Sequence, residues 1–173
     1  DFYQEDEINH EYYRNHKADT LAYSKKSYTI RVKDGEDVAF NHKSSFRGPV
    51  LEVRSLIHGI ENNATSISWE YLKGDNRLLE GLFDYSFATS FSEFEASLDK
   101  IHAPGLNVMY GDVEGNIAWW TVGRLYQLNS RVSTKFILNG QDSLHQIKAY
   151  HPFEKNPSAI NPPWNYVYSA NNQ

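Results

Sequence analysis

The residues of this chain that could take part in catalysis are few, and they form no common self-contained catalytic motif. The sequence has no Gly-x-Ser-x-Gly elbow, no His-Glu-x-x-His helix and no glycine-rich phosphate loop. Glu93 and Glu95 are expected to be solvated rather than a glycosidase pair, because they lie on the surface of a predicted helix. By residue type alone, Asn171-Asn172 is a polar exit from a strand.

Among the secondary-structure elements that would position such residues, the most clearly predicted is a β-hairpin. Two runs rich in β-branched and aromatic residues, 106–110 and 117–122, flank a turn in which Gly115 can take a positive φ. The second run is so apolar, with Trp119 and Trp120, that both of its faces are expected to be covered. We therefore predict that this hairpin is a central element.

Other strands and helices follow from the spacing of apolar residues. Helical spacing predicts one helix over 76–85 and a second that starts at the N-cap Ser90, with Glu93 as its capping-box partner. Alternation predicts strands over 28–33, 38–40, 66–71, 135–138 and 164–170, the first two as a hairpin with one solvated face. Since the chain shows no repeat or linker, one domain over residues 1–173 is expected.

Composition excludes several classes of function. The net charge is −5, from 17 basic and 22 acidic residues, and no basic stripe is present, so nucleic acid is not expected as a partner. No apolar run is long enough for a membrane span, and no export signal is visible at the start. The absence of cysteine excludes disulfides and a thiol nucleophile within the sequence. The aromatic content of 14% predicts a β-rich core with a tyrosine rim, or alternatively an aromatic ligand platform.

Several segments in order along the chain resemble one enzyme family. The run 104–124, with Tyr110-Gly-Asp112, Gly115-Asn116-Ile117 and Gly123-Arg124, is similar to a "P-x-Q-N…YAD-x-x-GNI…G-R" core. Matching landmarks on either side are 28–33 with Arg47-Gly48-Pro49-Val50 ("IRVK…HGPV"), 150–157 ("PFEE.P"), and Ser169-Ala170-Asn171-Asn172 ("(T/S)ANN"). Together they resemble the penicillin acylase family of N-terminal-nucleophile hydrolases.

The resemblance implies a fold and an activity. The implied fold is α+β, part of a four-layer αββα sandwich with mostly antiparallel sheets and two short helices. Family members cleave themselves to expose a Ser, occasionally Thr or Cys, that attacks an amide carbonyl while its own α-amine takes the proton. The expected substrate is a small N-acyl amide: a β-lactam side chain, an acyl-homoserine lactone, or an N-acylated amino acid or peptide. In the family the nucleophile precedes the position of Asp1, so this chain alone is expected to be inactive and to need the rest of its precursor.

The resemblance also assigns roles to individual residues. Asn171 matches the side-chain donor of the oxyanion hole, with Asn172 as the alternative one position on. Leu82 and Leu106 match positions that contact the acyl group, although both could be plain core leucines. Asp1 matches a ligand of a structural calcium ion in some members; no cofactor is required.

Three expectations remain: a departure from the family pattern at Arg47, the cellular location of the parent protein, and two rival functions. Arg47 stands where family members usually have His. The family is mostly exported, which implies a periplasmic or extracellular parent. The rival readings are a degenerate homologue without activity and a binding module that holds sugar or peptide on exposed Tyr and Trp; the second predicts aromatics side by side on one exposed face, whereas the enzyme reading buries Trp119 and Trp120.

Overall fold

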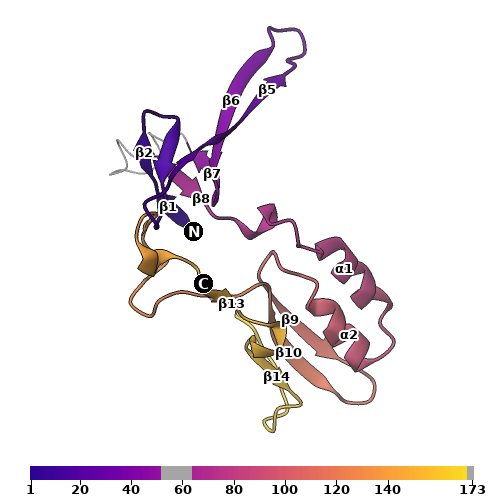
Figure 1. The fold of residues 1–173 in the computed structure, drawn as a ribbon. Coiled ribbons are helices and arrows are strands. Elements are labelled where there is room, and N and C mark those ends of the chain that lie inside the picture. The colour runs from indigo at the N-terminus through magenta and orange to yellow at the C-terminus, as the bar shows by residue number, and fades with distance from the viewer. Residues whose placement is uncertain (52–63, 171–173) are drawn as a thin grey trace. The chain divides into compact units, whose positions relative to one another are not determined.

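The computed structural model describes residues 1–51 and 64–170. The chain divides into two compact units, shown in Figure 1. Unit 1 comprises Asp1–Trp69 with Leu128–Ile147, and unit 2 comprises Glu70–Gln127 with Lys148–Gln173. Each unit is described by itself below, and the expectation of a single domain stays a prediction.

The described strands of unit 1 form two mainly antiparallel sheets. The larger has the strand order β12-β1-β8-β7-β6-β5, in which only the β1–β12 pair is parallel. Its strands are β1 (Phe2–Gln4), β5 (Ser24–Ile30), β6 (Val38–Ser45), β7 (Gly48–Leu51), β8 (Thr65–Ile67) and β12 (Leu138–Asn139). The smaller sheet, which the charged sequence of 5–19 did not suggest, contains β2 (Asp6–Ile8), β3 (Tyr12–Arg14) and β4 (Thr20–Ala22). A short 3-10 helix, η2, spans Ser143–His145.

The core of unit 1 contains tyrosines. Tyr13, 2% exposed, stacks on Tyr23 with ring centroids 4.8 Å apart and accepts a hydrogen bond from the backbone N–H of Phe46 at 2.9 Å. The pKa of Tyr13 is raised, chiefly because burial disfavours the charged phenolate. The tyrosines of this unit are therefore not confined to the rim that composition suggests.

A buried ion pair ties the sheet of unit 1 to the β12–η2 connection. The Arg47 guanidinium donates to Glu5 Oε2 at 2.8 Å, to the Gly140 carbonyl at 2.6 Å and to Gln146 Oε1 at 3.0 Å. Ser66 Oγ donates to the other Glu5 oxygen at 2.6 Å. Since the side chains of Arg47 and Glu5 are 4% and 0% exposed, both charges are shielded from bulk solvent.

The hairpin of β5 and β6 extends out of unit 1 (Figure 1). It confirms the predicted hairpin, and Tyr28 lies opposite Phe40 with the two rings stacked 5.2 Å apart. The prediction of one solvated face is too restrictive, because every residue of β5 is exposed. Alternation shows which residues share a face, but whether that face is covered depends on what packs against it.

Unit 2 packs two helices on one face of a three-stranded sheet (Figure 1). The sheet order is β14-β10-β9, all antiparallel. Its elements are α1 (Leu78–Phe87), α2 (Phe91–Leu98), β9 (Leu106–Gly111), β10 (Ile117–Val122) and β14 (Ser158–Ile160). The pair β11 (Tyr126–Gln127) and β13 (Ala149–Tyr150) and the 3-10 helices η1 (Glu70–Leu72) and η3 (Phe153–Lys155) complete the unit.

The core of unit 2 lies between the helices and the sheet. Its fully buried members are Leu98, Ile101, Ala118, Trp120 and Val122. Gly81 lets α1 approach closely, since a Cβ there would lie 2.6 Å from Ile101 Cγ1 and 2.9 Å from the Ser97 carbonyl oxygen. The short helices are thus held mainly by burial of their apolar faces.

The start of α2 confirms the predicted N-cap in a slightly different form. Ser90 Oγ accepts the backbone N–H of Glu93 at 3.2 Å, as in a capping box. The Glu93 carboxylate, however, bonds the N–H and hydroxyl of Thr89 at 2.8 and 2.9 Å, one residue earlier than the motif predicts. These bonds lower the pKa of Glu93.

Candidate functional site

The central hairpin is confirmed, and its two tryptophans face opposite sides of the sheet. Trp120 is 2% exposed in the core beneath the helices and donates its indole N–H to Glu95 at 3.1 Å. Trp119, next along the strand, points to the other face, where its indole N–H donates to Asn107 Oδ1 at 3.2 Å. The interpretation that both faces of β10 are buried therefore holds for Trp120, whereas Trp119 is half-buried.

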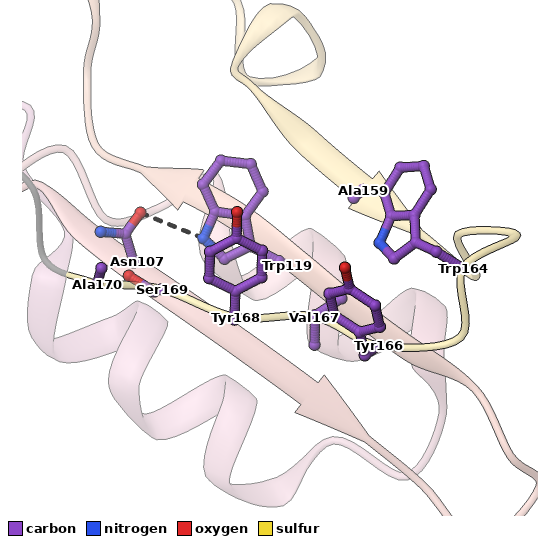
Figure 2. A pocket seen from close by; sticks show the side chains of 9 residues that line it. All are labelled: Asn107, Trp119, Ala159, Trp164, Tyr166, Val167, Tyr168, Ser169 and Ala170. Carbon is purple, nitrogen blue, oxygen red and sulfur yellow. Dashed lines mark hydrogen bonds between the residues drawn. The ribbon is translucent and has the colours of Figure 1, made fainter.

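On the Trp119 face lies a pocket of about 400 Å³ (Figure 2). The sheet contributes Asn107, Trp119 and Ala159 to its lining. The other wall is the segment 164–170, with Trp164, Tyr166, Val167, Tyr168, Ser169 and Ala170. The pocket therefore lies between the sheet of unit 2 and the segment that follows β14.

Aromatic rings dominate this pocket. Trp164, Tyr166 and Tyr168 are 55%, 58% and 73% exposed, and the two tyrosine rings lie 6.0 Å apart. Figure 2 shows these rings and Trp119 around the same hollow. Large exposed rings around a concave surface can hold a flat apolar or sugar-like group by burial and stacking.

The segment 164–170 is not part of any sheet in the described chain, although alternation predicts a strand there. Alternating large residues record which side chains share a face, but a strand also needs a ladder partner. The first two residues of the segment belong to a reversal at residues 161–165, in which Asn161 and Asn165 have φ of 45° and 60°. The N–H of Asn165 donates to the Pro162 carbonyl at 2.9 Å and closes that turn.

The candidate oxyanion donor Asn171 and its alternative Asn172 lie outside the described residues. Ala170, which directly precedes Asn171, lines the pocket. The role of Asn171 stays a prediction.

The two leucines assigned to the acyl group lie on the helix side of the sheet rather than in the pocket. Leu82 of α1 is half-buried against the core cluster. Leu106 pairs with Val122 and is 38% exposed; by alternation it shares its face with Val108, which packs on the same core. The structure thus places both leucines on one side of the sheet, and acyl contact by either stays a prediction.

Asp1 is held at the start of the sheet in unit 1. Its backbone nitrogen donates to the Ser68 carbonyl at 3.1 Å, and its own carbonyl accepts the Ser68 N–H at 2.9 Å. Among residues 1–51 and 64–170, no three acidic or histidine side chains gather as a possible metal site. The calcium assignment to Asp1 stays a prediction.

A polar cluster in unit 2, apart from the pocket, surrounds Arg124, which belongs to the Gly123-Arg124 landmark. The guanidinium pairs with Asp75 and lies over the ring of Tyr150, 3.8 Å from its centroid. The Tyr150 hydroxyl donates to Glu70 at 3.0 Å. Burial first, and then the Glu70 carboxylate, raise the pKa of Tyr150 to about 12, so it stays a neutral donor at physiological pH.

Two asparagines to whose side chains the sequence assigned no role anchor the segment leading to the pocket. Asn156 donates to the carbonyls of Thr121 and Gly123, and Asn161 both donates to Asn116 and accepts the N–H of Ile117. The available signal was the pair of Asn-Pro dipeptides at 156–157 and 161–162, which mark fixed turns. Only the tertiary structure shows that the two side chains reach β10.

The architecture is similar to that of a solved structure. A thermostable penicillin G acylase from Alcaligenes faecalis matches this chain with a TM-score of 0.85 at 22% identity, and the likeness shows the α+β fold of antiparallel sheets with two helices on one of them. The match covers all of this chain and 30% of that one. The model of the penicillin amidase family matches residues 1–173, and the chain belongs to that family.

No helix in the described ranges 1–51 and 64–170 combines the length and apolar character needed to cross a membrane.

Proposed function

We propose that this chain is part of an amidohydrolase that cleaves a small N-acyl amide through an acyl-enzyme on an N-terminal Ser outside residues 1–173. The family match over the full length of the chain carries this proposal. The partners are then the amide substrate and the remainder of the precursor. A periplasmic or extracellular parent, as implied by the resemblance, belongs to the same proposal.

In this mechanism the chain supplies part of the oxyanion hole and of the acyl site. The Asn171 amide donates to the oxygen that becomes negative when the nucleophile attacks, so it acts in the transition state more than in the ground state. Leu82 and Leu106 contact an apolar acyl group from the helix side of the sheet. A calcium ion, if bound with Asp1 as one ligand, is structural.

The first experiment follows the full-length parent by intact mass spectrometry. Self-cleavage into two chains, with Ser, Thr or Cys at the new N-terminus, is the expected result. A chain that stays uncleaved contradicts the active-enzyme proposal and favours a degenerate homologue.

Asn171→Ala in the cleaved parent is the second experiment. Loss of one oxyanion donor is expected to lower kcat by about 10²- to 10³-fold with little change in KM. Asn172→Ala is the matched control, because the two positions differ by one residue. If Asn172→Ala alone lowers kcat, the register of the assignment is wrong; if neither variant does, the oxyanion role is wrong.

Ligand binding without catalysis is the second candidate, favoured by the exposed rings of Trp164, Tyr166 and Tyr168 around one pocket. That function predicts that Tyr166→Ala and Tyr168→Ala weaken the binding of a sugar or peptide. Tryptophan fluorescence measures this binding. Binding together with an uncleaved parent would support it over the hydrolase.

A further inference from the structure

Asn156 is a polar side chain that is buried almost completely, at 5% exposure. Its Nδ2 donates to the carbonyls of Thr121 at 3.0 Å and Gly123 at 2.9 Å. These carbonyls lie at the end of β10, where Gly123, with a φ of +133°, takes the chain out of the sheet. Since Oδ1 accepts no hydrogen bond from the described residues, the two donated bonds are what hold this side chain in place.

The bonds of Asn156 continue directly into the β10–β14 ladder. The Thr121 N–H donates to the Pro157 carbonyl at 2.8 Å, and Ser158 then lies opposite Trp120. At the far end, Asn161 Oδ1 accepts the N–H of Ile117 at 3.0 Å. The short strand β14 is thus held by an asparagine at each end, and these set its register on β10.

The register of β14 decides where the next segment starts. After the turn at 161–165 the chain returns along the pocket as residues 166–170 (Figure 2), and residue 171 follows. A strand of three residues has few ladder bonds of its own, so loss of one anchor allows slippage or fraying. Any such shift moves the segment 164–170 with it.

We propose that Asn156 is a positioning residue for the candidate oxyanion donor Asn171. Its two hydrogen bonds hold β14 in register and thereby hold the segment 164–170, which Asn171 directly follows in the sequence. This inference rests on the proposed function, because positioning matters for catalysis only if Asn171 acts on an amide.

The first test measures the segment itself, with or without activity. In the full-length parent, Asn156→Ala is expected to speed amide hydrogen exchange in peptides from 158–170 roughly tenfold. The matched control is Ser97→Ala, which changes another buried side chain of unit 2, whose hydroxyl donates to the Phe94 carbonyl within α2. Exchange over 158–170 that is the same in wild type, control and Asn156→Ala overturns the inference.

The second test is a double-mutant cycle on kcat. Asn156→Ala alone is expected to lower kcat about tenfold or more with KM nearly unchanged. Added to Asn171→Ala, it is expected to lower kcat no further, because the group it positions is gone. Ser97→Ala is expected to lower stability but leave kcat per titrated active site unchanged. A loss of the same factor in both backgrounds overturns the inference, even if exchange rises.

The two proposals fail separately. A wild-type parent that cleaves no N-acyl-4-nitroanilide contradicts the proposed function, and the exchange measurement then decides whether Asn156 holds the segment. An active parent in which Asn156→Ala keeps wild-type kcat contradicts the positioning role and leaves the function standing.

Discussion

Replacing Arg47 by Met tests whether the buried ion pair of unit 1 is as sensitive as its geometry implies. The substitution keeps an apolar side chain of similar length but removes the guanidinium. Glu5, whose side chain is fully buried, then loses the cation that pairs with it, and the Gly140 carbonyl and Gln146 Oε1 each lose the hydrogen bond from Arg47. Breaking one side of a buried pair costs about 3–5 kcal/mol of unfolding free energy.

The matched control is Arg14→Met in the same unit. Arg14 pairs with Asp6 at 3.5 Å, and the two side chains are 53% and 38% exposed. Such surface pairs contribute about 0–1 kcal/mol, because water and salt screen them. The same chemical change is therefore expected to have very different effects at the two positions.

Urea denaturation followed by circular dichroism measures both variants. The Arg47→Met loss of about 3–5 kcal/mol is expected in the unfolding free energy extrapolated to zero urea, against at most about 1 kcal/mol for Arg14→Met. The double variant Glu5→Gln with Arg47→Met is expected to regain part of that loss, since no uncompensated charge remains and Gln can still accept from Ser66 Oγ. If Arg47→Met costs no more than Arg14→Met, the reasoning about the buried pair is wrong.

Two further predictions concern unit 2. Gly81→Ala is expected to destabilise by about 1 kcal/mol, because overpacking against Ile101 at 2.6 Å outweighs the gain in helix propensity; Gly74→Ala, whose Cβ meets nothing within 4 Å, is the control. A higher urea midpoint for Gly81→Ala would contradict this. Bonds from the side chain and backbone N–H of Asn116 hold the pKa of Asp112 below its ordinary 3.8. The Asp112 carboxylate therefore contributes fully to the free energy of unfolding above pH 3.8, and this contribution is lost as the pH falls through the lower pKa of the folded state. An NMR titration of the Asp112 carboxyl that shows no lowering of its pKa would refute the prediction.

The central hairpin and the helix pair could be predicted because local signals agree with the tertiary structure. The turn at 112–116 has its glycine with φ of +91° at 115, and Ser90 caps α2. The small sheet β2-β3-β4 could not be predicted, because its strands are only three residues long and are separated by charged and polar residues. The capping box also differs by one residue, since Thr89 offers two donors that compete with the backbone of Ser90.

The candidate site was less predictable than the fold. The landmarks locate Asn171, Leu82 and Leu106 in the chain, but not which face of the sheet each side chain occupies. Trp119 and Trp120 read alike in sequence, yet one lines a pocket and the other fills the core. The importance of Asn156 depends on a reach of more than thirty positions back to Thr121 and Gly123.

The sequence by itself determined the family, the α+β class, and the turns and caps, since each depends on residue type and near-neighbour spacing. The tertiary structure decided which polar groups are buried and what they bond. Arg47, in place of the usual His, becomes half of a buried ion pair only because β1, β7 and the loop at Gly140 converge on it. Asn156 becomes an anchor only because β14 returns to β10. Burial depends on long-range packing, which residue spacing does not encode.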